Sequence, residues 1–98
     1  MSEFSKQYRD TMLPGQKHAF ADTDPEFVQI FESFAFDEVV NQGSLDDRTR
    51  FMAILAALLG CQGVDEFKVM LPAALNLGVT PVEVKEIVYQ SAAYLGIG

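Results

Sequence analysis

The 98-residue sequence has no tryptophan, one cysteine and one histidine. A single cysteine cannot form a disulfide within the chain, so nothing calls for an oxidising compartment. The histidine, His18, lies in a polar connection, and no cluster of histidines or cysteines is present to complete a metal site. A surface position for His18 is favoured over a catalytic or metal-binding one. We therefore expect no metal site and no cofactor.

Basic residues are also scarce. Seven Lys and Arg stand against fourteen Asp and Glu, which gives a formal net charge of −7. Because binding to phosphates requires a patch of Lys and Arg, the scattered basic residues argue against nucleic acid and against an anionic membrane surface as partners. The N-terminal stretch MSEFSKQYRD lacks the apolar run of a signal peptide. We expect a cytoplasmic protein.

Hydrophobic residues, in contrast, make up 49% of the sequence and include eight Phe. In so small a domain this share indicates contacts between subunits as well as a core. The central element is predicted at residues 45–60, LDDRTRFMAILAALLG, which is apolar on every side from Phe51 onward. An S-x-x-D capping box at residues 44–47 opens it. A helix of this kind is buried on all sides, here by the two helices that follow and by sister copies.

Two helices are predicted before the central one. Phe4, Tyr8 and Met12 recur every four residues, which predicts a helix over residues 3–13. Asp24-Pro25-Glu26 combines an N-cap, a first-turn proline and a favourable acid, and begins a helix that runs to Gly43. Its core face is expected to carry Phe27, Ile30, Phe31, Phe34 and Val39, with Gln29, Glu32 and Asp37 facing outward.

Two more helices are predicted after the central one, and no strand pattern is present. A tight turn containing Cys61 leads to a helix over residues 64–78, which ends at an N-L-G stop. Pro72 predicts a kink inside this helix. The T-P-V-E stretch at residues 80–83 is a second capping box. We expect antiparallel packing of the three helices, with these residues of the last one buried: Val82, Val84, Ile87, Val88, Ala92 and Ala93.

Three motifs give the sequence a specific resemblance: L-D-x-R-T-R at residues 45–50, A-A-L-N-x-G-V-T at 73–80 and Y-x-G at 94–96. They resemble the carboxymuconolactone decarboxylase family, which includes the AhpD-like alkylhydroperoxidases. The resemblance implies an all-α, AhpD-like domain of about five helices with a buried central helix, assembled into trimers or hexamers. The resemblance covers a helical domain at residues 24–98, preceded by an N-terminal helix and linker at residues 1–23. It implies one more C-terminal helix than this domain holds, so we expect the sequence to be a fragment of a longer chain.

The peroxidase branch of that family uses C-x-x-C-x-x-x-H. The resemblance places its cysteines and histidine at Gly63, Glu66 and Met70, and none of them is retained. Cys61 lies two positions too early and has no second thiol with which to form a disulfide. A peroxidatic Cys61 requires access to solvent and an external thiol, whereas the other interpretation is a buried, inert thiol.

The decarboxylase branch fits better, because it carries glutamate at the positions of Glu66 and Glu38, although its two histidines correspond to Met70 and Gln90. Decarboxylation needs a proton donor beside the developing carbanion and donors that hold the carboxylate. The resulting candidates are Glu66, Gln90 and Glu38 in catalysis, with Met70 and Tyr94 in substrate binding. Gln90 and Tyr94 lie four apart on one helix face. The competing interpretation is a buried hydrogen bond between Glu66 and Gln90 that fixes helix packing.

Three functions therefore stay open. The first is a decarboxylase-like enzyme for a small acidic or lactone-type metabolite, with a closed, partly apolar pocket that contains a carboxyl group. The second is a thiol-dependent peroxidase that uses Cys61. The third is a non-catalytic, oligomeric binding domain whose pocket has lost its active groups. The sequence favours the first, with a small molecule as substrate and a homo-oligomer as the assembly.

Overall fold

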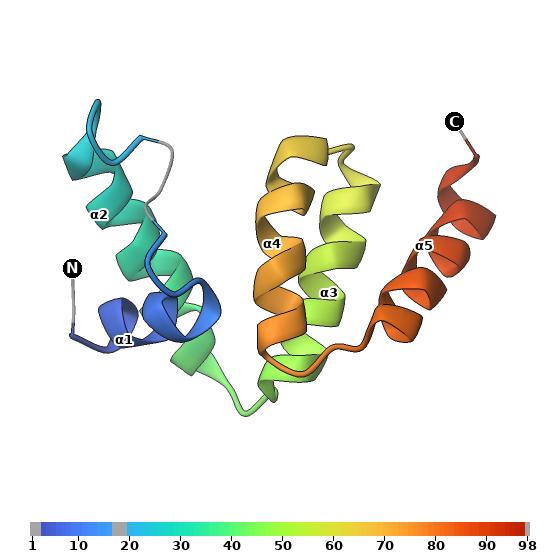
Figure 1. Cartoon of the computed structure of the whole chain (residues 1–98), viewed down its shortest axis with the longest axis horizontal. Helices are drawn as coiled ribbons and strands as arrows, with labels where there is room; N and C mark the ends of the chain where they lie inside the picture. The colour runs from blue at the N-terminus through green and yellow to red at the C-terminus, as the bar shows by residue number, and fades with distance from the viewer. Residues whose placement is uncertain (1–2, 17–19, 98) are drawn as a thin grey trace. The chain divides into compact units, whose positions relative to one another are not determined.

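The computed structural model describes residues 3–16 and 20–97, and His18 lies outside them. Within these ranges the chain is helical apart from turns and short connections, and it contains no strand. The elements are α1 (Glu3–Met12), α2 (Pro25–Ser33), the π-helical turn η1 (Phe34–Glu38), the 3-10 turn η2 (Val40–Gln42), α3 (Asp47–Gly60), α4 (Val64–Asn76) and α5 (Pro81–Leu95) (Figure 1). The predicted all-α fold is confirmed.

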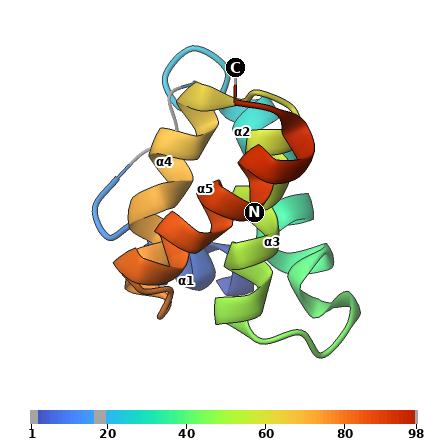
Figure 2. The same ribbon diagram turned by 90° about the vertical axis from the view of Figure 1, so that its right-hand side faces the viewer.

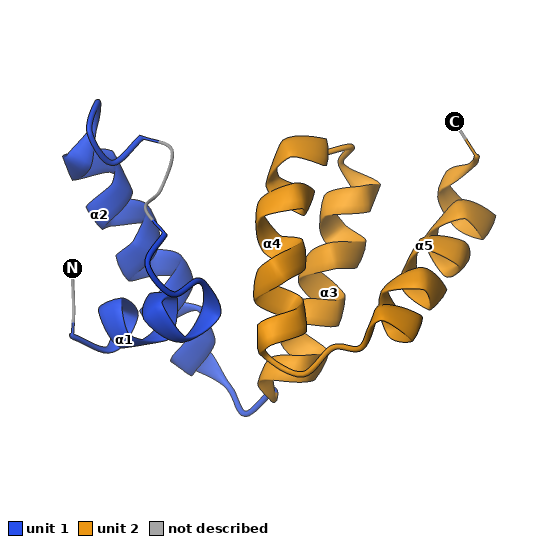
Figure 3. Ribbon diagram, in the orientation of Figure 1, with its two compact units in different colours: residues 1–45 blue, residues 46–98 orange. Residues whose placement is uncertain are grey.

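The chain divides into two compact units, Met1–Leu45 and Asp46–Gly98 (Figure 3). The first contains α1, α2 and the two η turns, and the second contains α3, α4 and α5. In the described part of the chain, no helix is both long enough and apolar enough to span a membrane.

An aromatic cluster and a buried ion pair hold the first unit together. Phe36 of η1 packs against Tyr8 of α1 and Phe31 of α2, with ring centroids 6.3 and 5.9 Å apart. Glu32 is 2% exposed, and its Oε1 lies 3.4 Å from Nε of Arg9 on α1. The prediction that Glu32 faces outward is wrong, because the arginine on the neighbouring helix offsets the cost of burying its carboxylate.

The buried stripe of this segment differs from the predicted core face. Val28, Glu32 and Phe36 are buried at a four-residue spacing. The regular α-helix also ends at Ser33 and continues as η1 and η2, so it does not reach Gly43 as an α-helix. Four of the five residues predicted for the core face are exposed: Phe27, Ile30, Phe34 and Val39.

In the second unit both α4 and α5 pack against α3, which is the central helix of this unit as predicted. Phe51 and Leu55 of α3 are buried, together with Met70, Ala73 and Ala74 of α4. The alanines of α3 at positions 53, 56 and 57 are exposed. Within its own unit α3 is therefore not buried on all sides, because only α4 and α5 cover it there.

The start of α3 lies two residues later than the predicted capping box. Asp46, not Ser44, is the N-cap, and its carboxylate accepts a hydrogen bond from the Thr49 backbone N–H at 2.7 Å. Hydrogen bonds from the Thr49 side chain and backbone hold the pKa of Asp46 below its usual value of 3.8.

The start of α5 is the predicted capping box. The Thr80 hydroxyl accepts from the Glu83 backbone N–H at 3.2 Å, and Glu83 Oε1 accepts from the Thr80 N–H at 2.9 Å. Glu83 also pairs with Arg48 of α3, whose Nε lies 3.3 Å from Oε1. The N-terminal end of α5 is thus attached to α3 by an ion pair as well as by the chain.

No residue of α5 is buried. The predicted burial of its apolar residues is wrong, because α5 packs on α3 and not along α4. In Figure 1 the C-terminal end of α5 leans away from α4, and Figure 2 views the same unit from the side of α5. The residues concerned are Val82, Val84, Ile87, Val88, Ala92 and Ala93.

Candidate functional site

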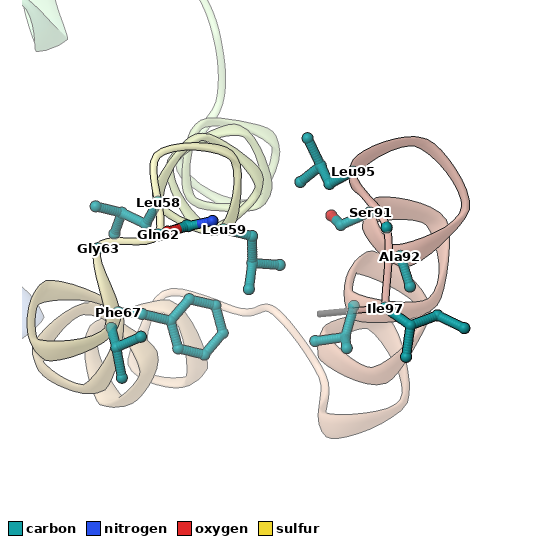
Figure 4. Close-up of a pocket in the computed structure, with 12 residues that line it drawn as sticks. Leu58, Leu59, Gln62, Gly63, Phe67, Ser91, Ala92, Leu95 and Ile97 are labelled. Atoms are coloured by element: carbon teal, nitrogen blue, oxygen red, sulfur yellow. The ribbon is translucent and has the colours of Figure 1, made fainter.

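A pocket of about 530 Å³ lies in the second unit, between the α3–α4 turn and the C-terminal half of α5 (Figure 4). Its volume falls within the range of roughly 300–1,000 Å³ that is typical of small-molecule sites. The pocket exists because α5 is attached at its N-terminal end and stands off from α4 further along. Most of its wall is apolar and includes Leu58, Leu59, Phe67, Val88, Leu95 and Ile97.

The α3–α4 turn that forms one wall is a Schellman motif. The Gly63 N–H donates to the Leu58 carbonyl at 2.8 Å, and the Gln62 N–H donates to the Leu59 carbonyl at 3.2 Å. Such a turn needs one residue in the left-handed region, and glycine is the usual choice. Here that residue is Gln62, with φ of 60°, the one non-glycine residue with positive φ in the described ranges. An L-residue in this region costs about 1–2 kcal/mol.

Two uncharged polar side chains line the pocket, Gln62 and Ser91. In Figure 4 they point from opposite walls towards the space between the helices. Neither side chain has a hydrogen-bond partner elsewhere in the part of the chain that the structure describes. The amide of Gln62 provides two donors and an acceptor, and the hydroxyl of Ser91 provides one donor and two acceptor lone pairs.

Glu66, Gln90 and Tyr94 lie beside this pocket and do not line it. Each directly precedes a residue of the wall, and one residue corresponds to about 100° around a helix. All three are exposed, Tyr94 to 87%. The interpretation of a buried Glu66–Gln90 hydrogen bond is therefore wrong. The pocket is also open on one side, without a carboxyl group in its lining, in contrast to the predicted closed pocket.

The other predicted residues occupy three different environments. Met70 is 8% exposed in the core of the second unit. Cys61 is exposed at the C-cap of α3, where its thiol donates to the Leu58 carbonyl at 3.6 Å, so the interpretation of a buried thiol is wrong. Glu38 is the last residue of η1 in the first unit and is exposed. Over residues 3–16 and 20–97, no group of three His, Cys, Asp or Glu residues is arranged to hold a metal ion.

Gln62 and Ser91 are absent from the residues predicted from the sequence, although each has a local signal. Gln62 stands in G-C-Q-G, where the end of a helix calls for a left-handed residue. Ser91 lies three residues after Val88 and four before Leu95, so it shares a face with two apolar residues of the last helix. Neither signal belongs to a family motif.

Comparison with known proteins shows similarity to one family and to a curated relative. The model of the carboxymuconolactone decarboxylase family matches residues 25–98. A 4-carboxymuconolactone decarboxylase from Acinetobacter baylyi is 31% identical over 93 residues, which cover 89% of this chain and 69% of that relative. The region matched by the family model includes every residue that lines the pocket.

Proposed function

The chain belongs to the carboxymuconolactone decarboxylase family, and we propose that it is a decarboxylase-like domain that acts on a small acidic or lactone-type metabolite in the pocket beside α5. The observation that carries the proposal is the pocket itself, an apolar space with two uncharged hydrogen-bonding groups next to the first turn of α4. Small-molecule sites commonly have this composition. Family membership supports the class of reaction, and the pocket supports the place where it occurs.

Glu66 is the proposed proton donor. It lies in the first turn of α4, three residues after Gly63 and one before Phe67, both of which line the pocket. When a carboxylate leaves as CO₂, the C–C bond breaks and its electron pair stays on the substrate carbon. That carbon takes a proton from Glu66, which water then reprotonates. Gln90 and Tyr94 on α5 stay candidates for contacts at the rim.

The test is CO₂ release from 4-carboxymuconolactone by the 98-residue chain. Removing a general acid typically lowers the rate by about 10²–10⁴-fold, so Glu66→Gln should lose at least about 100-fold. Asp65→Asn is the matched control, since Asp65 is an exposed acid in the same turn. Equal rates for Glu66→Gln and the unsubstituted chain would remove Glu66 from the mechanism, and no release at all would contradict the proposed reaction.

The exposure of Cys61 favours a second candidate, thiol-dependent peroxidase activity. The Cys61 thiolate would attack the peroxide, break its O–O bond and release an alcohol, leaving a sulfenic acid. An external thiol would form a mixed disulfide with loss of water, and a second one would restore Cys61. Peroxide consumption with a thiol reductant should fall to background in Cys61→Ala, and equal rates in both proteins would rule this candidate out.

We also propose that the protein works as a homo-oligomer, as the family resemblance implies. Large apolar residues are exposed in both units, including Phe27 and Ile30 in the first and Val82 and Ile97 in the second. Exposed apolar surface of this kind commonly marks an interface. Sedimentation equilibrium should give a mass of several chains. If the assembly binds ligands and no turnover is found in any assay, the protein is a non-catalytic binding domain.

A further inference from the structure

The lining of the pocket carries no charge that would balance a carboxylate. No Lys, Arg, His, Asp or Glu lies among the described residues that form its wall. An ionised carboxylate loses its hydration when it enters apolar surroundings, and that loss is large unless a cation or several donors replace the water. The interior of this pocket therefore suits an uncharged molecule better than an acid.

The N-terminus of α4, a source of positive potential in the pocket wall, already has acids beside it. Gly63 is the N-cap of this helix and lies in the pocket wall. Asp65 and Glu66 occupy the first turn, and the chain has a net charge of −7. An ionised carboxylate at this end, such as that of Asp65, is well placed on the helix dipole and repels a further anion. A neutral carbonyl group does not experience this repulsion.

Gln62 and Ser91 supply the polar part of the recognition. Their side chains point into the pocket from opposite walls (Figure 4), and a carbonyl or ring oxygen can accept from either one. Gln62 does so from a left-handed backbone that glycine would adopt more easily. Strained backbone often occurs at functional sites, and the Gln62 side chain is exposed, so its amide is accessible to a ligand in the pocket.

From these features we infer that the pocket takes an uncharged, mainly apolar ring compound with a carbonyl group, such as a neutral lactone, and excludes carboxylates from its interior. The inference rests on the function proposed above, which places the substrate in this pocket. It narrows the ligand from a small acidic or lactone-type metabolite to an uncharged one. A substrate that carries an acid would place only its ring in the pocket and keep its carboxylate at the open side, in water.

The test compares coumarin, a neutral lactone, with coumarin-3-carboxylate, titrated into the intact 98-residue chain and followed by NMR. Coumarin should bind at least about tenfold more tightly, because its carboxylated analogue must leave a charge in apolar surroundings or bind less deeply. The amide signals of Gln62 and Ser91 should shift with coumarin. Tighter or equal binding of the carboxylate would overturn the inference, and so would the absence of coumarin binding at millimolar concentration.

Two variants locate the contact. Gln62→Gly and Ser91→Ala should each weaken coumarin binding by about two- to tenfold, the usual effect of one neutral hydrogen bond. Gln62→Gly also relieves backbone strain, so lost binding cannot be attributed to unfolding. Glu86→Gln, at an exposed position of α5 outside the wall, is the matched control and should bind like the unsubstituted chain. Unchanged affinity in both pocket variants would contradict the inference.

The remaining outcomes separate this inference from the proposed reaction. Coumarin binding without CO₂ release from any lactone acid would remove the reaction and leave the ligand class in place. CO₂ release together with tighter binding of coumarin-3-carboxylate would support the proposed reaction and overturn the inferred ligand class. If the Gln62 and Ser91 signals shift with protein concentration and not with coumarin, the occupant is a second copy of the chain and the inference fails.

Discussion

Two turns of the second unit end a helix with the same hydrogen bonds and with different residues. At the end of α3 the left-handed residue is Gln62, with φ of 60°, and at the end of α4 it is Gly78, with φ of 106°. In the second turn the Val79 N–H donates to the Ala74 carbonyl at 3.0 Å, and the Gly78 N–H donates to Leu75 at 3.4 Å. Both turns are therefore Schellman motifs.

The two turns also differ in the residues that follow them. After Gly78, Val79 is 2% exposed and Thr80 caps the next helix with its side chain. After Gln62, Gly63 caps α4 without any side chain, and the turn lines the pocket. The turn after α4 thus has glycine at its left-handed position and a side-chain cap. The turn after α3 has a strained glutamine, no side-chain cap and a pocket beside it.

The largest effect should come from Gly78→Gln, which makes the second turn resemble the first. No atom lies within 4 Å of a Cβ added at Gly78, so a clash plays no part. However, φ of 106° lies outside the small left-handed region open to L-residues. We expect a loss of about 1–2 kcal/mol in the free energy of unfolding, measured by urea denaturation. A loss below about 0.5 kcal/mol, as at an ordinary surface position, would remove the backbone argument.

A smaller loss is expected from Thr80→Ala, which deprives the second turn of its cap. Removing such an N-cap costs about 1 kcal/mol, so the transition temperature of the chain should fall by several degrees. Thr80→Ser is the control, because its hydroxyl can still accept from the Glu83 N–H. Equal transition temperatures for the alanine and serine variants would show that the cap adds nothing to stability.

Gln62→Gly, which makes the first turn resemble the second, should raise the free energy of unfolding instead of lowering it. Relief of the left-handed backbone is partly offset by the larger conformational freedom of glycine in the unfolded chain. A net gain of about 0.5 kcal/mol should remain in urea denaturation. A destabilised variant would mean that the Gln62 side chain supports the fold itself, and the comparison of the two turns would lose its meaning.

The smallest effect concerns the start of α3, where Asp46 provides the side-chain cap that Gly63 lacks. The pKa of Asp46 is lower in the folded chain than its usual 3.8. Its contribution is therefore present above the unfolded pKa and is lost as the pH falls below 3.8 through the folded pKa. Unfolding curves at pH 7 and pH 3 should differ less in Asp46→Asn than in the unsubstituted chain. An identical pH dependence of both proteins would contradict this assignment.

Local signals in the sequence predicted the end of α4 and the start of α5, but they placed the start of α3 two residues too early and the end of α2 at Gly43 instead of Ser33. The capping box at Thr80 and Glu83 and the stop at Gly78 depend on residues close in sequence, so pattern alone identifies them. Buried faces depend on distant partners. Glu32 is buried because Arg9 lies on another helix, and no periodicity within α2 contains that information. The boundary predicted at residue 24 stays a prediction.

Some of the residues predicted for the site lie next to the pocket wall in the sequence, and none of them lines it. Motifs that resemble the family directed attention to Glu66 and Gln90, each of which directly precedes a residue of the pocket wall. The wall itself depends on how far α5 stands from α4, and this distance follows from packing in three dimensions. Gln62 and Ser91 belong to no motif, so only the structure brings them together. The roles assigned to the predicted site residues all stay predictions: Glu66, Gln90, Glu38, Cys61, Met70 and Tyr94.

One carboxylate, that of Glu83, both begins α5 and attaches it to Arg48 of α3. Dissolved salt weakens ion pairs between partly exposed groups, and it therefore loosens the fixed end of the wall that faces the pocket. Direct contacts to an uncharged ligand change little with ionic strength. If the affinity for coumarin depends on salt concentration, the dependence would then come from the Arg48–Glu83 ion pair and the pocket wall that it holds in place.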